Sequence, residues 1–228
     1  MIEDTPFAKV FKTSVTTVSL ADEDGGTRVT LGRVHGHKDT GKTACPGALY
    51  DRLGDIRAGA KALATGSHPV ADAHGWPDGE QVPLDFALAN AKRIVDAVEM
   101  PVTVDFESAY SVDPAKAAAN VVRLAATGAV GCNFEDQVIG GEGLHPLKEQ
   151  VKRIEAIRLA VGEAFFINAR TDLYLKTQNY DSALVDQAID RGRAFADAGA
   201  SGFFVPRLSD PRQIERIVRE VPLPLKVI

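Results

Sequence analysis

The sequence is poor in cysteine and lacks long apolar runs, and these shortages exclude several classes of protein. Its 228 residues contain only two cysteines, Cys45 and Cys132, so a framework of several disulfides is excluded and reduced thiols are expected. The opening stretch MIEDTPFAKVFKTS has no apolar core of the kind that signal peptides carry. No apolar run approaches the roughly 18 residues that a membrane-spanning helix needs. We therefore expect a cytoplasmic protein that does not enter a membrane.

An excess of positive charge is also missing. Lysine and arginine number 26 against 31 aspartate and glutamate residues, which gives a formal net charge of −5. Such a chain has no general electrostatic attraction for nucleic acid or for anionic lipid, although a single site can still be positive enough to bind a small anion. The hydrophobic content of 45% and the charged content of 25% are ordinary for a globular domain.

What the sequence does contain, from about residue 44 onward, is one repeated unit. A short apolar run is followed by a polar or glycine-rich connection and then by an amphipathic stretch. Continuous apolar runs without alternation are typical of parallel strands that are buried on both faces. Seven runs of this kind predict seven strands: TACPGAL, AKALATGS, PVTVDFES, AVGCNFED, AFFINARTD, SGFFVPRL and LPLKVI.

The amphipathic stretches between these runs predict helices at 84–98, 146–161 and 182–198. Two more helices are expected after Asp113-Pro114 and Asp210-Pro211, because aspartate favours the N-cap and proline the first helical position. Alternating strands and helices predict a parallel α/β fold, and a strand spacing of roughly thirty residues is close to that of a (β/α)₈ TIM-type barrel. We expect a barrel domain at 44–228, apparently truncated after the seventh strand.

Residues 1–43 follow a different pattern. The stretch TSVTTVSLADEDGGTRVTLGRV resembles a β-hairpin around Asp-Gly-Gly, and a disordered segment is the equally open alternative. We treat 1–43 as an N-terminal extension of uncertain structure.

Acidic residues follow the third and fourth predicted strands. Catalytic groups of α/β barrels lie at the carboxyl ends of the strands. Asp105 and Glu107 are two residues apart, which predicts that both point to one side of a strand, and Glu135 ends the neighbouring strand. Carboxylates gathered in this way repel one another unless a cation intervenes, and Mg²⁺ prefers oxygen ligands. The set predicts a magnesium site; the alternative is that these acids cap helices or pair with arginine.

Three other segments could carry chemistry. Arg170, after the fifth predicted strand, could bind a carboxylate or phosphonate with its planar fork, or could simply pair with Asp172 or Glu135. The Gly66-Ser67 turn could offer N–H groups and a hydroxyl to an anion. Two further candidates lie in loops: Asp78, whose alternative is an ordinary Pro-Asp-Gly turn, and His145, which ends the glycine-rich segment QVIGGEGLH and could be an acid or base of a mobile lid or an exposed loop histidine.

Taken together, the strand ends and loops described above resemble those of the isocitrate lyase/phosphoenolpyruvate mutase superfamily, in a less characterised, phosphonomutase-like branch. The resemblance runs from about Cys45 to Ile228. It implies a (β/α)₈ barrel that often exchanges its last helix between subunits, so a homo-oligomer is expected. It also implies Mg²⁺, with Mn²⁺ as an alternative, and a small anionic 2-oxo acid. The phrases that carry it are AGAKALATGS, GWPDGE, PVTVDFESAY, GCNFEDQ, FFINARTD, GFFVPRL and LPLKVI.

The resemblance also implies roles for individual residues. The metal ligands are the acids Asp105, Glu107 and Glu135, with Glu at the second position where the best-known branches have Asp. The resemblance implies that Arg170 and Ser67 bind the substrate and that Asp78 is an acid of the gating segment. Gly66 as a substrate-binding residue and His145 as a catalytic one are predicted from the residues alone.

The segment at 137–145 departs from the family. Isocitrate and methylisocitrate lyases carry a K-[KR]-C-G-H loop whose cysteine works as an acid, and the mutase and phosphonopyruvate hydrolase branch has Lys and Asn in its lid. The loop QVIGGEGLH has none of these residues. The resemblance as a whole still predicts a lyase, mutase or hydrolase that makes or breaks a C–C or C–P bond through a metal-stabilised enolate. The alternative is a non-catalytic barrel that binds a metabolite or a partner chain.

Overall fold

The computed structural model describes residues 61–177 and 180–227. The first expected strand, at 43–49, and the hairpin expected within 1–43 lie outside these residues. Within the described ranges, no helix combines the length and the apolar character that crossing a membrane would require.

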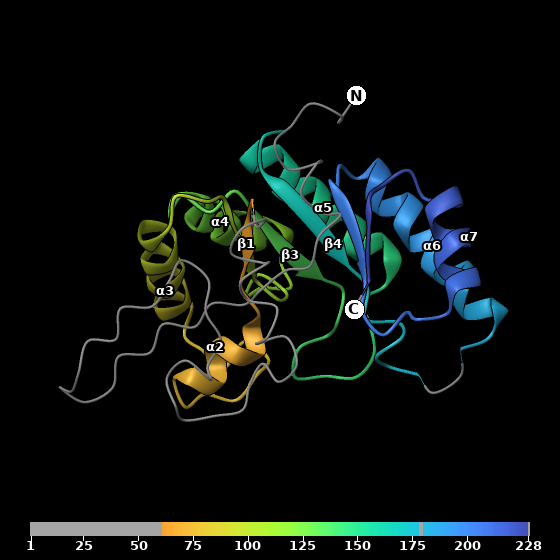
Figure 1. Cartoon of the computed structure of the whole chain (residues 1–228), viewed down its shortest axis with the longest axis horizontal. Helices are drawn as coiled ribbons and strands as arrows, with labels where there is room; N and C mark the ends of the chain where they lie inside the picture. The colour runs from red at the N-terminus through yellow and green to blue at the C-terminus, as the bar shows by residue number, and fades with distance from the viewer. Residues whose placement is uncertain (1–60, 178–179, 228) are drawn as a thin grey trace.

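Six parallel strands form one sheet in the order β1-β2-β3-β4-β5-β6, so each strand lies beside its predecessor in the sequence (Figure 1). This order, repeated without reversal, is that of a barrel wall, and it confirms six of the seven expected strands as part of a curled half-barrel. The strands are β1 (Leu63–Ala64), β2 (Val102–Asp105), β3 (Gly131–Glu135), β4 (Phe166–Arg170), β5 (Gly202–Val205) and β6 (Leu225–Val227).

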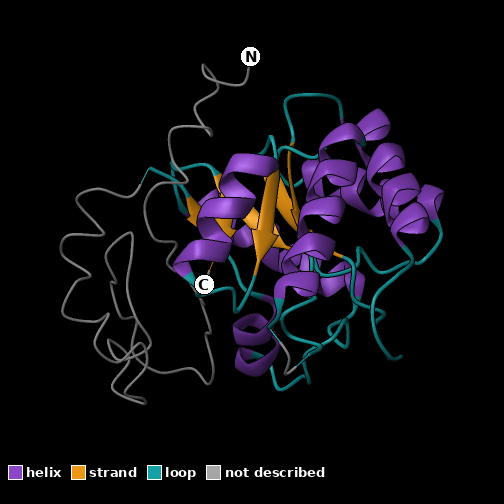
Figure 2. Cartoon of the chain, turned by 90° about the vertical axis from the view of Figure 1, so that its right-hand side faces the viewer, coloured by secondary structure: helices purple, strands orange, loops and turns teal. Residues whose placement is uncertain are grey.

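Helices follow the strands and surround the sheet (Figure 2). The expected aspartate caps are present: Asp113 accepts a hydrogen bond from Lys116 N at 2.9 Å, and Asp210 accepts one from Arg212 N at 2.8 Å. The helices are α2 (Ser67–Ala73), α3 (Leu84–Ala97), α4 (Pro114–Ala125), α5 (Leu147–Val161), α6 (Ser182–Asp197) and α7 (Pro211–Glu220).

The helix α2 is a correction, because the sequence predicted only a Gly-Ser turn at this place. Gly66 is the N-cap residue and Ser67 is the first residue of the helix. Pro69 lies in the first turn, where a missing N–H costs nothing because it would have no partner inside the helix. Pro69 is therefore compatible with the beginning of this helix.

The core lies between the strands and the helices. All five residues of β3 and the first four of β4 are buried, as expected for strands covered on both faces. The helices α4 and α5 fill one side of this core with residues that are fully buried, namely Val121, Leu124, Ile154 and Ile157. This packing fixes the strand ends from which the polar side chains project.

Candidate active site at the carboxyl ends of the strands

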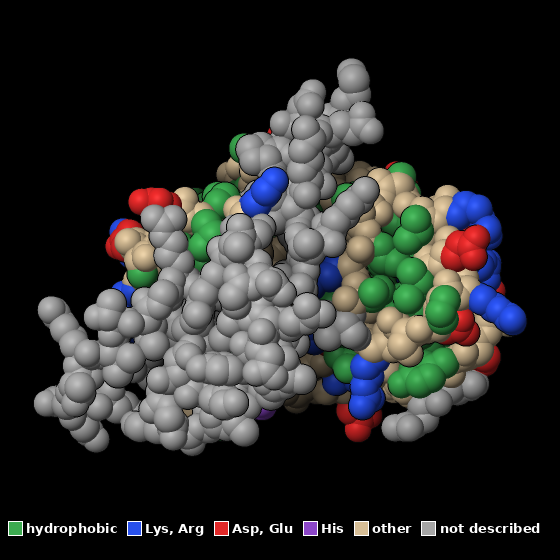
Figure 3. All heavy atoms as spheres, viewed as in Figure 1, with side chains coloured by type: hydrophobic (Ala, Val, Ile, Leu, Met, Phe, Trp, Pro, Cys, Tyr) green, Lys and Arg blue, Asp and Glu red, His purple; other side chains and the backbone are tan. Residues whose placement is uncertain are grey.

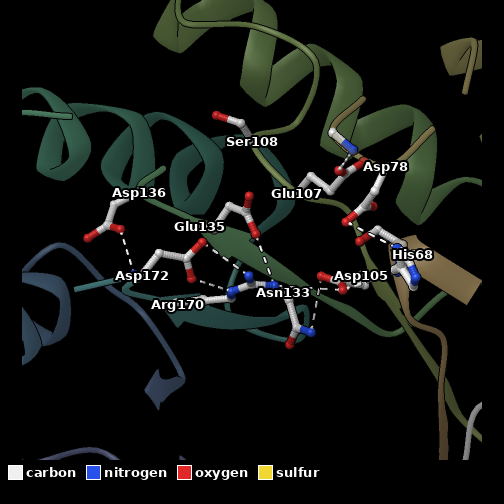
Figure 4. A network of polar contacts seen from close by, with 12 residues as sticks. His68, Asp78, Asp105, Glu107, Ser108, Asn133, Glu135, Asp136, Arg170 and Asp172 are labelled. Atoms are coloured by element: carbon white, nitrogen blue, oxygen red, sulfur yellow. Dashed lines mark hydrogen bonds and ion pairs between the residues drawn. The ribbon is translucent and has the colours of Figure 1, made fainter. Parts of the chain in front are cut away.

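A row of polar side chains crosses β2, β3 and β4. Asp105 is in register with Asn133, and Asn133 is in register with Asn168, so the three side chains share one face of the sheet. Asn168 Nδ2 donates to Asn133 Oδ1 at 2.8 Å, and Asn133 Nδ2 donates to Asp105 Oδ1 at 3.3 Å. The amides therefore hold the Asp105 carboxylate in place (Figure 4). Sequence reasoning missed Asn133 and Asn168, although an amide inside an otherwise apolar strand was a signal for them.

One layer further along the strands, Glu135 of β3 is in register with Arg170 of β4. Glu135 Oε2 lies 3.0 Å from Arg170 Nη1, and Asp105 Oδ2 lies 3.9 Å from the same nitrogen. Two of the three expected acids thus converge on one cationic nitrogen (Figure 4). Asp172 holds the rest of the guanidinium, by accepting from Nε at 2.6 Å and from Nη2 at 3.1 Å. Arg170 makes both of the ion pairs that the sequence left open.

Burial sets the electrostatics of this pair. Removal from water raises the pKa of Glu135, and the Arg170 charge opposes that rise. Burial alone would lower the pKa of Arg170, but Glu135, Asp105 and Asp172 together raise it. We assign the pair as ionised because a guanidinium keeps its proton in proteins and lies within ion-pair distance of the carboxylate. A buried carboxylate of this kind is stable only while a cation stays beside it.

Glu107 is oriented differently from the prediction, which placed it on the same side of a strand as Asp105. The strand β2 ends at Asp105, and Glu107 has a left-handed backbone with φ +50°. Its carboxylate accepts hydrogen bonds from Gly79 N at 3.0 Å and from Glu80 N at 3.0 Å and 3.1 Å. The alternation rule failed because it applies only to extended backbone.

The contact between Glu107 and the 79–80 segment is reciprocal. Glu80 Oε1 accepts hydrogen bonds from Ser108 N at 2.9 Å and from Tyr110 N at 2.7 Å. Each carboxylate therefore caps the backbone that carries the other. Burial, and to a lesser extent Asp78, Asp105 and Glu80, raise the pKa of Glu107 to about 7, while the hydrogen bond from Glu80 N lowers it.

No group of three or more His, Cys, Asp or Glu side chains is arranged to hold a metal ion in the part of the chain that the structure describes. Glu107 is turned toward 79–80, which leaves Asp105 and Glu135 as the acids that face one cation position. Mg²⁺ commonly takes one or two carboxylates and keeps several waters, so this pair is compatible with that ion. A cavity of about 30 Å³ lies beside Asp105 and Glu107 and is also lined by Thr65 and Ser67.

Gly66 and Ser67 lie next to Asp105, as expected for one site. Ser67 N donates to Asp105 Oδ2 at 3.2 Å, and Asp105 N donates to Thr65 Oγ1 at 3.1 Å. The backbone N–H that the sequence offered to a bound anion is directed at this carboxylate. Asp78 is more exposed, and its Oδ2 lies 3.8 Å from His68 Nδ1 (Figure 4).

His145 closes the 137–145 segment against α6 rather than against the acids. Its N–H donates to Asp136 O at 2.7 Å, and its carbonyl accepts from Arg191 at 3.3 Å. Burial, followed by the charges of Arg153 and Arg191, lowers the pKa of its imidazole. No contact within the described residues joins this ring to Asp105, Glu107 or Glu135.

Two residues of α5 that the sequence did not predict bind the backbone at the ends of the strands. Arg153 of α5 is buried, and its Nη2 donates to Ser108 O and Ser108 Oγ, both at 2.7 Å, and to Ser111 O at 2.9 Å. Gln150, one turn earlier, accepts from Arg153 Nη1 and donates to Glu135 O at 3.1 Å. The helix α5 thereby positions the backbone at the ends of both β2 and β3.

Comparison with known proteins shows the family to which the chain belongs. The model of a family described as phosphoenolpyruvate phosphomutase matches residues 55–228. The chain belongs to the phosphoenolpyruvate phosphomutase family. The expected resemblance is thereby confirmed.

Members of this family are enzymes of the expected kinds. The chain is 32% identical to 2-methylisocitrate lyase of Salmonella typhimurium over 178 residues, which is 73% of this chain and 58% of the lyase. It spans between 50% and 64% of the length of the curated relatives that it matches at 25–32% identity.

Solved structures share the fold. A protein of Burkholderia cenocepacia J2315 with a provisional phosphonomutase assignment superposes with a TM-score of 0.73 at 42% identity, over 78% of this chain and 73% of that one. A phosphonopyruvate hydrolase solved with oxalate and Mg²⁺ has a TM-score of 0.67 at 20% identity, over 76% of this chain and 62% of that one. The second likeness concerns the fold alone.

Proposed function

We propose that this chain is a Mg²⁺-dependent lyase, mutase or hydrolase that makes or breaks a C–C or C–P bond in a small 2-oxo acid or its phosphonate. The observation that carries the proposal is the convergence of Asp105 and Glu135 on Arg170 Nη1 at the carboxyl ends of β2, β3 and β4. Family membership supports a reaction of this type, because the relatives include lyases and mutases.

Asp105 and Glu135 are the residues that would hold the metal ion, with Glu107 as a third acid at the same end of the sheet. When bound, the ion supplies Lewis-acid stabilisation of the negative charge that develops on the 2-oxo group. The amides of Asn133 and Asn168 keep Asp105 in one orientation, and Gln150 fixes the backbone at Glu135. Such preorganisation matters because electrostatic stabilisation works best when the groups do not need to reorient.

Arg170 is the residue that we propose for binding the anionic end of the substrate. Asp172 occupies Nε and Nη2, and this pairing fixes the plane of the guanidinium. Nη1 is the nitrogen directed at the proposed metal position, so it is the donor that a substrate carboxylate would reach. A planar group held in this way is preorganised for a carboxylate or phosphonate.

Ser67, with Gly66 beside it, would add a hydroxyl to the same anionic group, because Ser67 N already contacts Asp105. Asp78 would act from the neighbouring loop, which Glu107 binds through Gly79 and Glu80. His145 as a lid acid or base rests on its place in the glycine-rich segment 137–145, since its described contacts lead to Asp136 and Arg191.

The test is a turnover screen of 2-oxo acids and phosphonates, including oxaloacetate and phosphonopyruvate, with Mg²⁺, with Mn²⁺ and with a chelator. Release of pyruvate that requires the metal is the expected result. Exchange of pyruvate methyl protons in D₂O provides a second readout, because it reports enolate formation without bond cleavage. A protein that binds 2-oxo acids but shows neither turnover nor exchange would be the non-catalytic binder.

A further inference from the structure

A second cationic side chain extends the row that contains Glu135 and Arg170. Arg170 is in register with Phe204 of β5, and Phe204 is in register with Lys226 of β6. Residues paired in this way on parallel strands project from the same face of a sheet. Lys226 Nζ lies 4.4 Å from the centre of the Phe204 ring, and the Arg170 guanidinium carbon lies 5.6 Å from it. Both cations therefore contact one aromatic ring inside the half-barrel.

The two cations differ in their partners. Arg170 has carboxylate oxygens of Glu135, Asp172 and Asp105 within 4 Å. Lys226 makes no ion pair of that length with any residue that the structure describes, and its ammonium lies against the Phe204 ring. Lys226 is half-buried. Burial lowers the pKa of Lys226, and Arg170 lowers it further, while Asp105 raises it.

A half-buried ammonium without an anion has lost part of its hydration, and an aromatic ring offsets this loss only in part. Three carboxylates already contact Arg170, whereas no carboxylate among the described residues lies within ion-pair distance of Lys226, so the charge of Lys226 can receive an added anion. The register of Lys226 with Phe204, and of Phe204 with Arg170, directs Lys226 to the same face of the sheet as the proposed metal position. The Phe204 ring, which is 4% exposed, holds the lysine stem beside that interior.

We propose that Lys226 is a specificity-determining residue that binds a second anionic group, a carboxylate or phosphonate on C3 of the 2-oxo acid. This inference rests on the proposed function, because the first anionic group would be the one that Arg170 and the metal position receive. Adjacent parallel strands are about 4.8 Å apart, so β4 and β6 stand roughly 10 Å apart at this register. Both side chains reach inward to the Phe204 ring between these strands, so a substrate with two anionic groups can present one to each cation.

The experiment compares ligands that differ by the second anion, with Mg²⁺ present. Pyruvate has one carboxylate, 3,3-difluorooxaloacetate adds a carboxylate on C3, and phosphonopyruvate adds a phosphonate there. Lys226→Met keeps an unbranched apolar stem for the contact with Phe204 and removes the charge. Lys226→Arg restores the charge, and Lys116→Met on the exposed face of α4 is the matched control. Affinities come from calorimetry, and thermal unfolding shows that each variant is folded.

Lys226→Met should weaken the binding of both C3-substituted ligands by a factor on the order of ten, the size expected for a lost hydrogen bond to a charged group. Pyruvate binding should stay within about twofold, Lys226→Arg should recover most of the loss, and Lys116→Met should behave as the unchanged protein does. A loss for one ligand alone identifies which anion is the natural one. Equal weakening of all three ligands, or of none, overturns the inference and leaves the proposed function standing. If the unchanged protein binds none of the ligands with Mg²⁺, both proposals fail.

Discussion

At the residue scale, Glu107 lies in an environment that penalises its charge. In the metal-free protein its pKa is raised to about 7 from an ordinary 4.5, chiefly by burial. The folded state therefore keeps a proton that the unfolded chain has already lost between these two values. The resulting stabilisation is full below about pH 4.5 and is lost as the pH rises through 7. It amounts to at most about 3 kcal/mol, because each unit of pKa shift corresponds to about 1.4 kcal/mol.

We expect the free energy of unfolding, measured with urea in the presence of a chelator, to be lower at pH 8 than at pH 5. Asp136, whose pKa burial raises to about 6, contributes in the same direction, so the decisive quantity is the difference made by one substitution. Glu107→Gln keeps an oxygen for Gly79 N and Glu80 N but cannot ionise. This variant should show a smaller decrease between the two pH values. An identical decrease in both proteins would show that Glu107 does not titrate in this range.

At the scale of the element, β3 and β4 meet at a contact that only glycine allows. A Cβ atom at Gly131 would lie 2.5 Å from the Phe166 carbonyl oxygen and 2.7 Å from Phe166 Cβ. Gly131→Ala should therefore push the strands apart and destabilise the fold by about 2–3 kcal/mol, as overpacking of a core does. Thermal unfolding measures the effect.

Gly162→Ala is the matched control for that substitution. Gly162 has φ +71°, but a Cβ atom there would meet nothing within 4 Å. Gly162→Ala should lower the free energy of unfolding only by the cost of a left-handed backbone at alanine, about 1 kcal/mol. If the two variants lost the same stability, crowding between the strands would not be the cause.

The helix α5 makes a second prediction at this scale. Arg153→Met would leave the carbonyl oxygens of Ser108 and Ser111 without their buried donor, at a cost of about 3 kcal/mol. Lys152→Met, on the exposed face of the same helix, loses one ion pair with Glu149 and should change stability by less than about 0.5 kcal/mol. Chemical denaturation of both variants tests the difference, and similar losses would refute a special role for Arg153.

The same elements show how far the sequence could predict the fold. The helices after Asp113-Pro114 and Asp210-Pro211 were predictable because a capping aspartate and a proline in the first turn are local signals. The buried strands were predictable from continuous apolar runs. The orientation of Glu107 was not, since it follows from a left-handed backbone beyond the end of β2 and from a partner segment 27 or 28 residues away.

The site was predictable in part for the same reason. Asp105, Glu135 and Arg170 could be placed together because parallel strands bring their carboxyl ends to one edge. The choice between substrate binding and ion pairing for Arg170 required distances. The role of Arg153 could not be predicted, because nothing in the sequence of a helix indicates which of its arginines will be buried.

At the scale of the whole molecule, an apolar surface predicts self-association. Figure 3 shows hydrophobic side chains gathered on the right-hand side of the molecule, where Figure 1, in the same view, draws α6 and α7. Val218 of α7 is 58% exposed. Contiguous apolar surface of this kind commonly marks a protein interface. Sedimentation velocity at micromolar concentration should detect an oligomer, and a monomer at every concentration tested would contradict this prediction.

The proposed function requires a divalent ion at Asp105 and Glu135, and a calorimetric titration of Mg²⁺ or Mn²⁺ in the presence of oxalate tests it most directly. Oxalate mimics the enolate of pyruvate and should bind only with the ion. Asp105→Ala should weaken the binding of the ion by a factor on the order of ten, equivalent to about 1.4 kcal/mol. Asp190→Ala, an exposed aspartate on α6, should leave it unchanged. Equal affinity for the ion in folded Asp105→Ala and in the unchanged protein would contradict the assignment.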